Sequence, residues 1–146
     1  MGKRLVILRT GIVLSKDGGA LAEFKKPIRF GVAGILGDGK QIVSWIHIDD
    51  ICRLYLNAIE NENFSGVYNA VASHSISNKN LTIQLAKAMN GKMFIPMPVP
   101  SFVLKIMLGE MSIEVLKSAT VSAEKIMKAG FVFKYPSLET ALPSLV

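Results

Sequence analysis

Short runs of apolar residues alternate with polar, glycine-rich stretches in the first half of the chain. Residues 5–8 read LVIL and residues 9–14 read RTGIVL, and both runs are rich in β-branched side chains. A further run of this kind, GVYNAV, occupies residues 66–71. Continuous apolar runs of this length are typical of strands covered on both faces, so the pattern predicts a parallel sheet.

A strand followed directly by a helix is predicted in the middle of the chain. Over residues 44–49 the side chains alternate between two faces, which is the strand period. Apolar residues then recur at helical spacing over residues 51–59. We expect Asp49 or Asp50 to cap this helix and the helix to end near Asn61.

A second helix is predicted by an apolar stripe and by signals at both of its ends. Leu81, Leu85 and Met89 share one face. Ser77 or Asn78 can cap its first turn, and Asn90-Gly91 is a good stop.

Proline and glycine divide the remaining parts of the first hundred residues. Residues 20–26 are compatible with a short helix that Pro27 would end. The four glycines between residues 31 and 39 predict a flexible loop. Residues 93–96 are predicted to form an edge strand, because the prolines around them cannot donate to a ladder.

The last third reads as helical. Residues 100–108 are apolar nearly all round, which predicts a helix that is buried or meets a partner, and residues 112–118 continue in helical character. A helix over 122–129 would use Ser122 as its cap and stop at Gly130. Another begins after Pro136 at helical spacing to residue 145.

Size and composition exclude several classes of protein. The chain has 146 residues, half of them hydrophobic, which suffices for one ordinary domain with a real core. Its formal charge of +6 comes from scattered lysines and arginines without interleaved aromatic residues, so we expect no nucleic-acid partner. The longest apolar stretch, from residue 93 to 109, holds three prolines and predicts no membrane span. The single cysteine, Cys52, fits a reducing compartment, and we expect the cytoplasm.

Four motifs along the chain resemble the extended short-chain dehydrogenases, most closely their sugar-nucleotide epimerase-like branch. They are Arg-Thr-Gly-Ile-Val-Leu at 9–14, Gly-Asp-Gly at 37–39 leading to His-x-Asp-Asp at 47–50, Tyr-Asn-Ala-Val at 68–71, and Ala-Gly-Phe-x-Phe-x-Tyr-Pro at 129–136. The resemblance implies the C-terminal half of an NAD(P)-binding, Rossmann-like α/β fold with a doubly wound parallel sheet. It also implies a division into residues 1–72, the end of that fold with the substrate loop, and residues 73–146, a small α-rich domain.

The same resemblance implies a cofactor and a set of pocket residues. Gly11 and Ile12 would lie beside the nicotinamide of NAD or NADP. The substrate pocket would be formed by Gly37, Trp45, His47 and Asn69. The family's diphosphate-binding Arg and its neighbouring Asp stand where this chain has Val43 and Ser44, so we expect a small-molecule substrate other than a nucleotide sugar.

Plainer interpretations of these residues remain open. Gly11 can relieve a crowded bend, and residues 37–39 can form an ordinary hairpin turn. A lone His47 on a strand is more often a packed residue than a proton carrier. Asp49 and Asp50 fit capping better than acid-base chemistry.

Three residues offer little chemistry of their own. His74 has no second ligand at metal spacing, so no metal site is predicted. Cys52 lies in a helix without a basic cluster to activate it. Ser44 lacks the Gly-x-Ser-x-Gly context of a nucleophile.

The chain lacks the two motifs on which such enzymes depend. Neither a glycine-rich pyrophosphate turn nor a Tyr-x-x-x-Lys pair occurs in the 146 residues, so no catalytic residue is assigned. We therefore expect the chain to be the C-terminal fragment of an epimerase-like oxidoreductase or isomerase and to be inactive by itself. The alternative is a non-catalytic module that associates with another chain, including a second copy, through its apolar helix at 100–108 and an exposed sheet edge.

Overall fold

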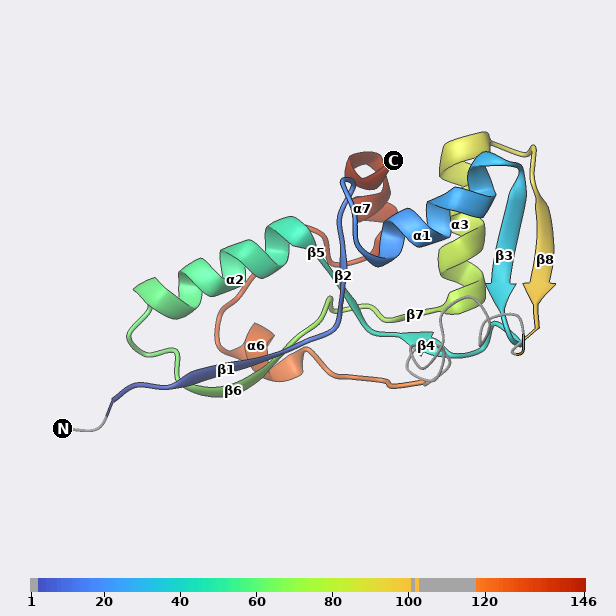
Figure 1. Ribbon diagram of the computed structural model, residues 1–146. Helices are drawn as coiled ribbons and strands as arrows, with labels where there is room; N and C mark the ends of the chain where they lie inside the picture. The colour runs from blue at the N-terminus through green and yellow to red at the C-terminus, as the bar shows by residue number, and fades with distance from the viewer. Residues whose placement is uncertain (1–2, 101, 103–117) are drawn as a thin grey trace.

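The computed structural model describes residues 3–100, 102 and 118–146. Its strands and helices form an α/β arrangement, as predicted (Figure 1). The strands are β1 Val6–Thr10, β2 Ile12–Leu14, β3 Val32–Leu36, β4 Ile42–Val43, β5 Trp45–His47, β6 Gly66–Ala70, β7 Ile76–Ser77 and β8 Ile95–Val99. The helices are α1 Ala20–Arg29, α2 Ile48–Glu60, α3 Asn78–Asn90, α6 Glu124–Lys128 and α7 Leu138–Leu145.

Parallel pairing dominates among the strands, and the chain changes partner at Gly11. Strand β1 pairs in parallel with β6, and β2 pairs in parallel with β5. The amide of Gly11 donates to the carbonyl of Ala70 at 3.1 Å, whereas the next amide, that of Ile12, donates to Ser44 at 2.9 Å. The predicted parallel sheet is thus confirmed, with a crossover between two neighbours at one glycine.

The glycine-rich segment 31–39 is a strand with a turn, so the prediction of a flexible loop was wrong. Residues 32–36 form β3, which pairs in parallel with β8. Strand β8 has Pro96 and Pro98 at alternate positions, while the amide of Ile95 donates to Gly31. The prolines therefore fall on the side that makes no ladder bonds with β3, as expected for an edge strand.

Residues 37–39 make a tight turn that does not close a hairpin. Gly37 and Gly39 have φ of 55° and 71°, and the amide of Gly39 donates to Leu36 at 2.9 Å. The strand after the turn, β4, pairs with β7 rather than with β3. Asp-Gly chemistry therefore predicted the turn correctly and the hairpin wrongly.

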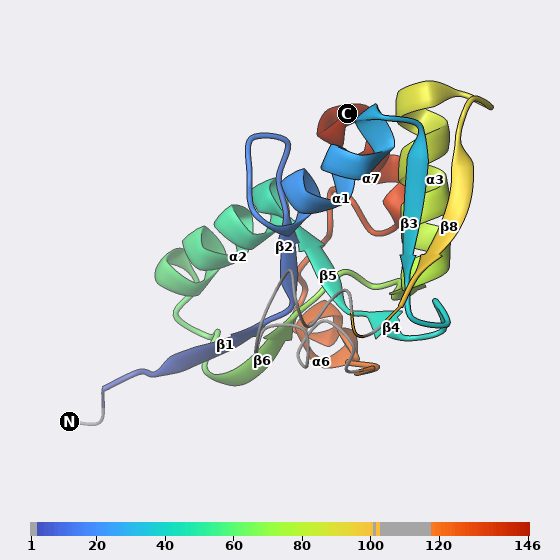
Figure 2. The same ribbon diagram turned by 45° about the vertical axis from the view of Figure 1, so that its right-hand side comes forward.

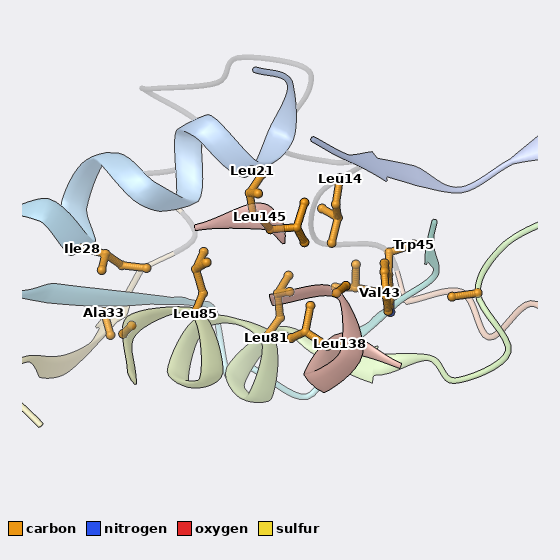
Figure 3. Packing of buried hydrophobic residues seen from close by; sticks show 13 residues of the cluster. Leu14, Leu21, Ile28, Ala33, Val43, Trp45, Leu81, Leu85, Leu138 and Leu145 are labelled. Carbon is orange, nitrogen blue, oxygen red and sulfur yellow. The ribbon is translucent and has the colours of Figure 1, made fainter. Parts of the chain in front are cut away.

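Two apolar clusters hold the elements together, and Figure 2 shows the elements of each gathered side by side. In the first, side chains from α1, α3 and α7 are directed toward one another, with Leu85 and Leu145 among them (Figure 3). The Nζ of buried Lys25 donates to the carbonyl of Leu145 and joins α1 to α7. The second cluster joins β1, β6, α2 and α6, with Phe64 stacked on Tyr68 at 4.0 Å.

Both clusters draw on residues before and after position 72. The first contains Leu14 and Leu138, and the second contains Ile51 and Phe133. The division into domains at residue 72 stays a prediction.

The helix ends follow the sequence signals in part. Helix α3 is capped by Ser77, whose Oγ accepts from the amide of Asn80, and ends before Gly91 at φ 63°, as predicted. Helix α1 does not stop at Pro27 but continues to Arg29. The fully buried Ile28 lies in that extension, so packing outweighs the missing hydrogen bond of proline.

The C-terminal part also departs from expectation in detail. Helix α6 begins at Glu124, later than predicted, although the Oγ of Ser122 accepts from the Glu124 amide at 3.1 Å. Pro143 lies inside α7. The helices predicted over 100–108 and 112–118 lie outside the described residues, apart from residues 100, 102 and 118. Among the described residues, none of the helices combines the length and apolar character that a membrane crossing requires.

Candidate functional site

An open pocket of about 420 Å³ lies where β1 and β6 end. In parallel strands the carboxyl ends meet at one edge of the sheet, which is where α/β folds bind ligands. The pocket is lined by Arg9, Thr10, Gly11, Asn69, Val71, Thr120, Val121 and Ser122.

Gly11 lies in a crowded part of the pocket lining. A Cβ at this position would lie 2.5 Å from the carbonyl oxygen of Ser44 and 2.8 Å from Cγ1 of Val71. Both distances are far below van der Waals contact, so a side chain cannot be accommodated without moving the backbone just before β5. The crowded-bend interpretation of Gly11 therefore holds in this structure, and Gly11 lines the pocket as well.

Ser44 binds the segment 119–121, part of which lines the pocket, through two hydrogen bonds. Its Oγ donates to the carbonyl of Ala119 at 2.6 Å and accepts from the amide of Val121 at 3.3 Å. The side chain of Asn69 holds the adjoining residue, because its Nδ2 donates to the carbonyl of Ser122 at 3.1 Å. Residues separated by 50 or more positions in the sequence thus form a single site.

The structure brings only some of the predicted pocket residues together. Gly11 and Asn69 both line the pocket, and Ile12 follows directly in β2. Gly37 lies in the turn after β3 and is not part of this lining. Trp45 and His47 are buried in β5, at 1% and 3% exposure, and do not reach the pocket either.

Sequence reasoning missed Arg9, Thr10 and the segment 120–122 as pocket residues. A signal for Arg9 was present, because it precedes Gly11 in the same strand and pairs in register with Asn69. No local pattern marked residues 120–122, since their position depends on Ser44 and Asn69.

His47 has a structural role in the fold. Its Nδ1 accepts from the amide of Asp49 at 3.0 Å, so His47, rather than Asp49 or Asp50, caps α2. Because Nδ1 is an acceptor, Nε2 carries the proton and donates to the Oγ of Ser144 at 3.0 Å. The ring also contacts Tyr135, with centroids 4.0 Å apart. His47 therefore joins the start of α2 to α7.

We expect the stability of the chain to fall below neutral pH because of His47. Burial lowers the pKa of His47, and the positive charge of Lys134 lowers it further. The carboxylates of Asp49 and Asp50 raise it, but each by less than burial lowers it. A histidine with a lowered folded-state pKa contributes stability that is complete above its unfolded pKa, about 6.5, and is lost as pH falls through the folded pKa. The free energy of urea unfolding, measured between pH 7.5 and 5, should decline less in His47→Asn than in the wild type.

His74→Asn is the matched control for this experiment, because His74 is exposed. It should keep the wild-type decline. If His47→Asn and the wild type lose stability in parallel, another group causes the pH dependence.

No metal chemistry is indicated in the described part of the chain. Within residues 3–100, 102 and 118–146, no three His, Cys, Asp or Glu side chains gather at a spacing suited to a metal ion. Cys52 is exposed on α2 and is not in the pocket lining.

Comparison with known proteins gives the class to which this fold and pocket are similar. An epimerase family protein of Staphylococcus aureus is 40% identical over all 146 residues, which span 48% of its length. The solved human epimerase family protein SDR39U1 (isoform 2) with NADPH has a TM-score of 0.89 and 32% identity, covering 97% of this chain and 48% of the human one. A nucleoside-diphosphate sugar epimerase from Corynebacterium glutamicum has a TM-score of 0.70 and 27% identity, covering 98% and 26%.

A family model described as a domain of unknown function (DUF1731) matches residues 99–145. The chain spans about half the length of the curated relatives that it matches. It is similar to the C-terminal part of epimerase family proteins, with a Rossmann-like architecture. The resemblance inferred from the four motifs is confirmed.

Proposed function

We propose that this chain supplies the substrate pocket, and the surface that faces the nicotinamide, of an NAD(P)-dependent epimerase-like oxidoreductase or isomerase. One observation carries the proposal, namely the pocket at the carboxyl ends of two parallel strands with Gly11 in its lining. Glycine at that position adds no side chain to the lining, and the space that a Cβ would take is filled by Ser44 and Val71. The cytoplasm remains the expected location.

The residues at the pocket fit the nicotinamide end of a dinucleotide. The hydroxyl of Thr10 and the amide of Asn69 are the donors and acceptors that a carboxamide needs, and Gly11 and Ile12 adjoin them. When bound, the cofactor would supply a hydride acceptor and donor. Gly37, Trp45 and His47 act in this proposal by holding the surrounding scaffold.

We expect the chain alone to bind NAD(P) weakly and to catalyse no reaction. The pyrophosphate turn and the tyrosine-lysine pair that such chemistry uses are absent from its sequence. Its own residues would orient a small-molecule substrate and limit the access of water, while proton transfer would fall to the missing pair.

Fluorescence titration with NADH and NADPH tests whether the chain alone lacks tight NAD(P) binding. The chain alone should give no saturable signal, whereas a chimera should bind. In that chimera the chain replaces the corresponding C-terminal part of the staphylococcal relative, and the intact relative is the positive control. Tight binding by the isolated chain, or a folded chimera without cofactor binding, would contradict the proposal.

The second candidate function is that of a non-catalytic association module. The observation in its favour is the exposure of Leu5 and Ile7, at 65% and 44%, beside and on β1. Among the described strands β1 pairs only with β6, so its other edge offers backbone groups for pairing. Light scattering on a concentrated sample separates the candidates, because a clean monomer contradicts self-association.

A further inference from the structure

Arg9 brings a positive charge to the pocket. It pairs in register with Asn69 across two parallel strands, so the two side chains leave the same face of the sheet. That face is opposite to the one on which Leu8 and Tyr68 pack into the second apolar cluster. Arg9 is exposed and lines the pocket together with Asn69.

Arg9 is one of several cations in the described structure that form no ion pair with a carboxylate of the described residues. Side chains of Lys26, Arg53, Lys128 and Lys134 each form an ion pair with a carboxylate. Arg9 forms no ion pair or hydrogen bond through its side chain with any described residue, and no Asp or Glu stands among the described residues that line the pocket. The described lining also contains Thr10, Thr120, Ser122 and Asn69, which carry hydroxyl and amide groups.

This combination suits an oxyanion. A guanidinium group presents parallel N–H donors that match two oxygens of a carboxylate or phosphate, and nearby hydroxyls and amides add further donors. The position at which the resemblance leads one to expect an arginine for a diphosphate, Val43, is buried and apolar here. The positive charge among the described lining residues comes from Arg9 on β1.

We propose that the pocket binds the carboxylate or phosphate group of an acidic small-molecule substrate, with Arg9 as the residue that selects for the anion. That the anion is part of a substrate rests on the proposed function, whereas the binding of the anion itself does not.

The test is an NMR titration of the ¹⁵N-labelled chain with inorganic phosphate and, separately, with acetate, at constant ionic strength set by sodium chloride. Saturable shifts should centre on Thr10, Gly11 and Asn69 and on the Nε–H of Arg9. Tighter binding of phosphate would assign a phosphate-bearing substrate, and tighter binding of acetate would assign a carboxylate.

Three variants make the experiment specific. Arg9→Gln should weaken binding by at least about tenfold, because a charge-assisted pair is lost. Arg9→Lys should retain part of the affinity, since lysine keeps the charge without the planar fork. Arg29→Gln removes the same charge from an exposed residue at the end of α1 and should leave the binding unchanged.

Equal effects of Arg9→Gln and Arg29→Gln would overturn the proposal. So would shifts that also appear with chloride alone, or shifts centred on Lys87 and Lys92 beside the second pocket. These results are independent of the cofactor titration. If the chimera binds NADPH but phosphate binding does not depend on Arg9, only the proposed oxyanion site is wrong. If phosphate binding depends on Arg9 but the folded chimera does not bind NADPH, only the proposed function is wrong.

Discussion

Replacing Gly11 with alanine should destabilise the chain by roughly 2–3 kcal/mol, as expected for an overpacked position. The added Cβ would lie 2.5 Å from the oxygen and 3.0 Å from the carbon of the Ser44 carbonyl, and 2.8 Å from the Val71 side chain. Two of these atoms belong to the backbone and cannot move aside by rotating a bond. The free energy of urea unfolding measures the effect.

The change should also damage the pocket. Relief of the clash requires β2 to move away from Ser44, and the Oγ of Ser44 holds the segment 119–121. Hydrogen exchange of the Val121 amide should therefore become faster in Gly11→Ala.

Gly18→Ala is the control for this prediction. No heavy atom lies within 4 Å of the Cβ that this change would add, and Gly18 does not need a positive φ. Its unfolding free energy should stay within about 0.5 kcal/mol of the wild type. If both variants behave alike, the crowding at Gly11 has no energetic consequence.

Local signals in the sequence predicted most of the secondary structure for physical reasons that the structure makes visible. Helix α3 has its apolar stripe, its serine cap and its glycine stop within one segment, so nothing distant is needed to define it. Strand β6 was likewise recognisable from its own composition. Strand β3 was not, because its glycines become a strand only through pairing with β8, some 60 residues later.

The candidate site was predictable only where a motif marked it. Gly11 and Asn69 were found because each belongs to a motif of the resembling family. Arg9 was missed although it belongs to the same motif as Gly11, because its place in the pocket follows from its register with Asn69. Ser122 was missed because its position depends on the hydrogen bond from Asn69. The family resemblance implied that His47 is a pocket residue, whereas in this structure its Nε2 bonds to the Oγ of Ser144 on α7.

Removing the carboxylate of Asp50 should have the largest effect on stability, a loss of roughly 2–5 kcal/mol in Asp50→Ala, because two backbone donors lose a buried charged acceptor at about 1–3 kcal/mol each. Asp50 is fully buried. Its Oδ1 accepts from the Lys134 amide and from the Arg53 guanidinium, and its Oδ2 accepts from the Tyr135 amide, each at 2.8 Å. Without it, two backbone donors and one cation lose their acceptor.

These bonds connect the His-x-Asp-Asp motif at 47–50 to the C-terminal motif at 129–136. The connection gives a physical reason for the presence of both motifs in one chain. Because α7 follows directly after the second motif, amide exchange in Leu138–Leu145 should accelerate in Asp50→Ala before the rest of the chain unfolds. Asp50→Asn, which keeps one acceptor oxygen, should fall between the wild type and Asp50→Ala.

Asp49→Ala supplies the matched comparison, because it removes the same charge one residue away. The Asp49 carboxylate is 46% exposed and pairs with the Nζ of Lys134 at 3.1 Å. An exposed ion pair of this kind contributes about 0–1 kcal/mol. A large difference between the two alanine variants would locate the effect in the buried hydrogen bonds of Asp50. A small difference in unfolding free energy between the two variants would mean that the hydrogen bonds of Asp50 do not stabilise the C-terminal segment.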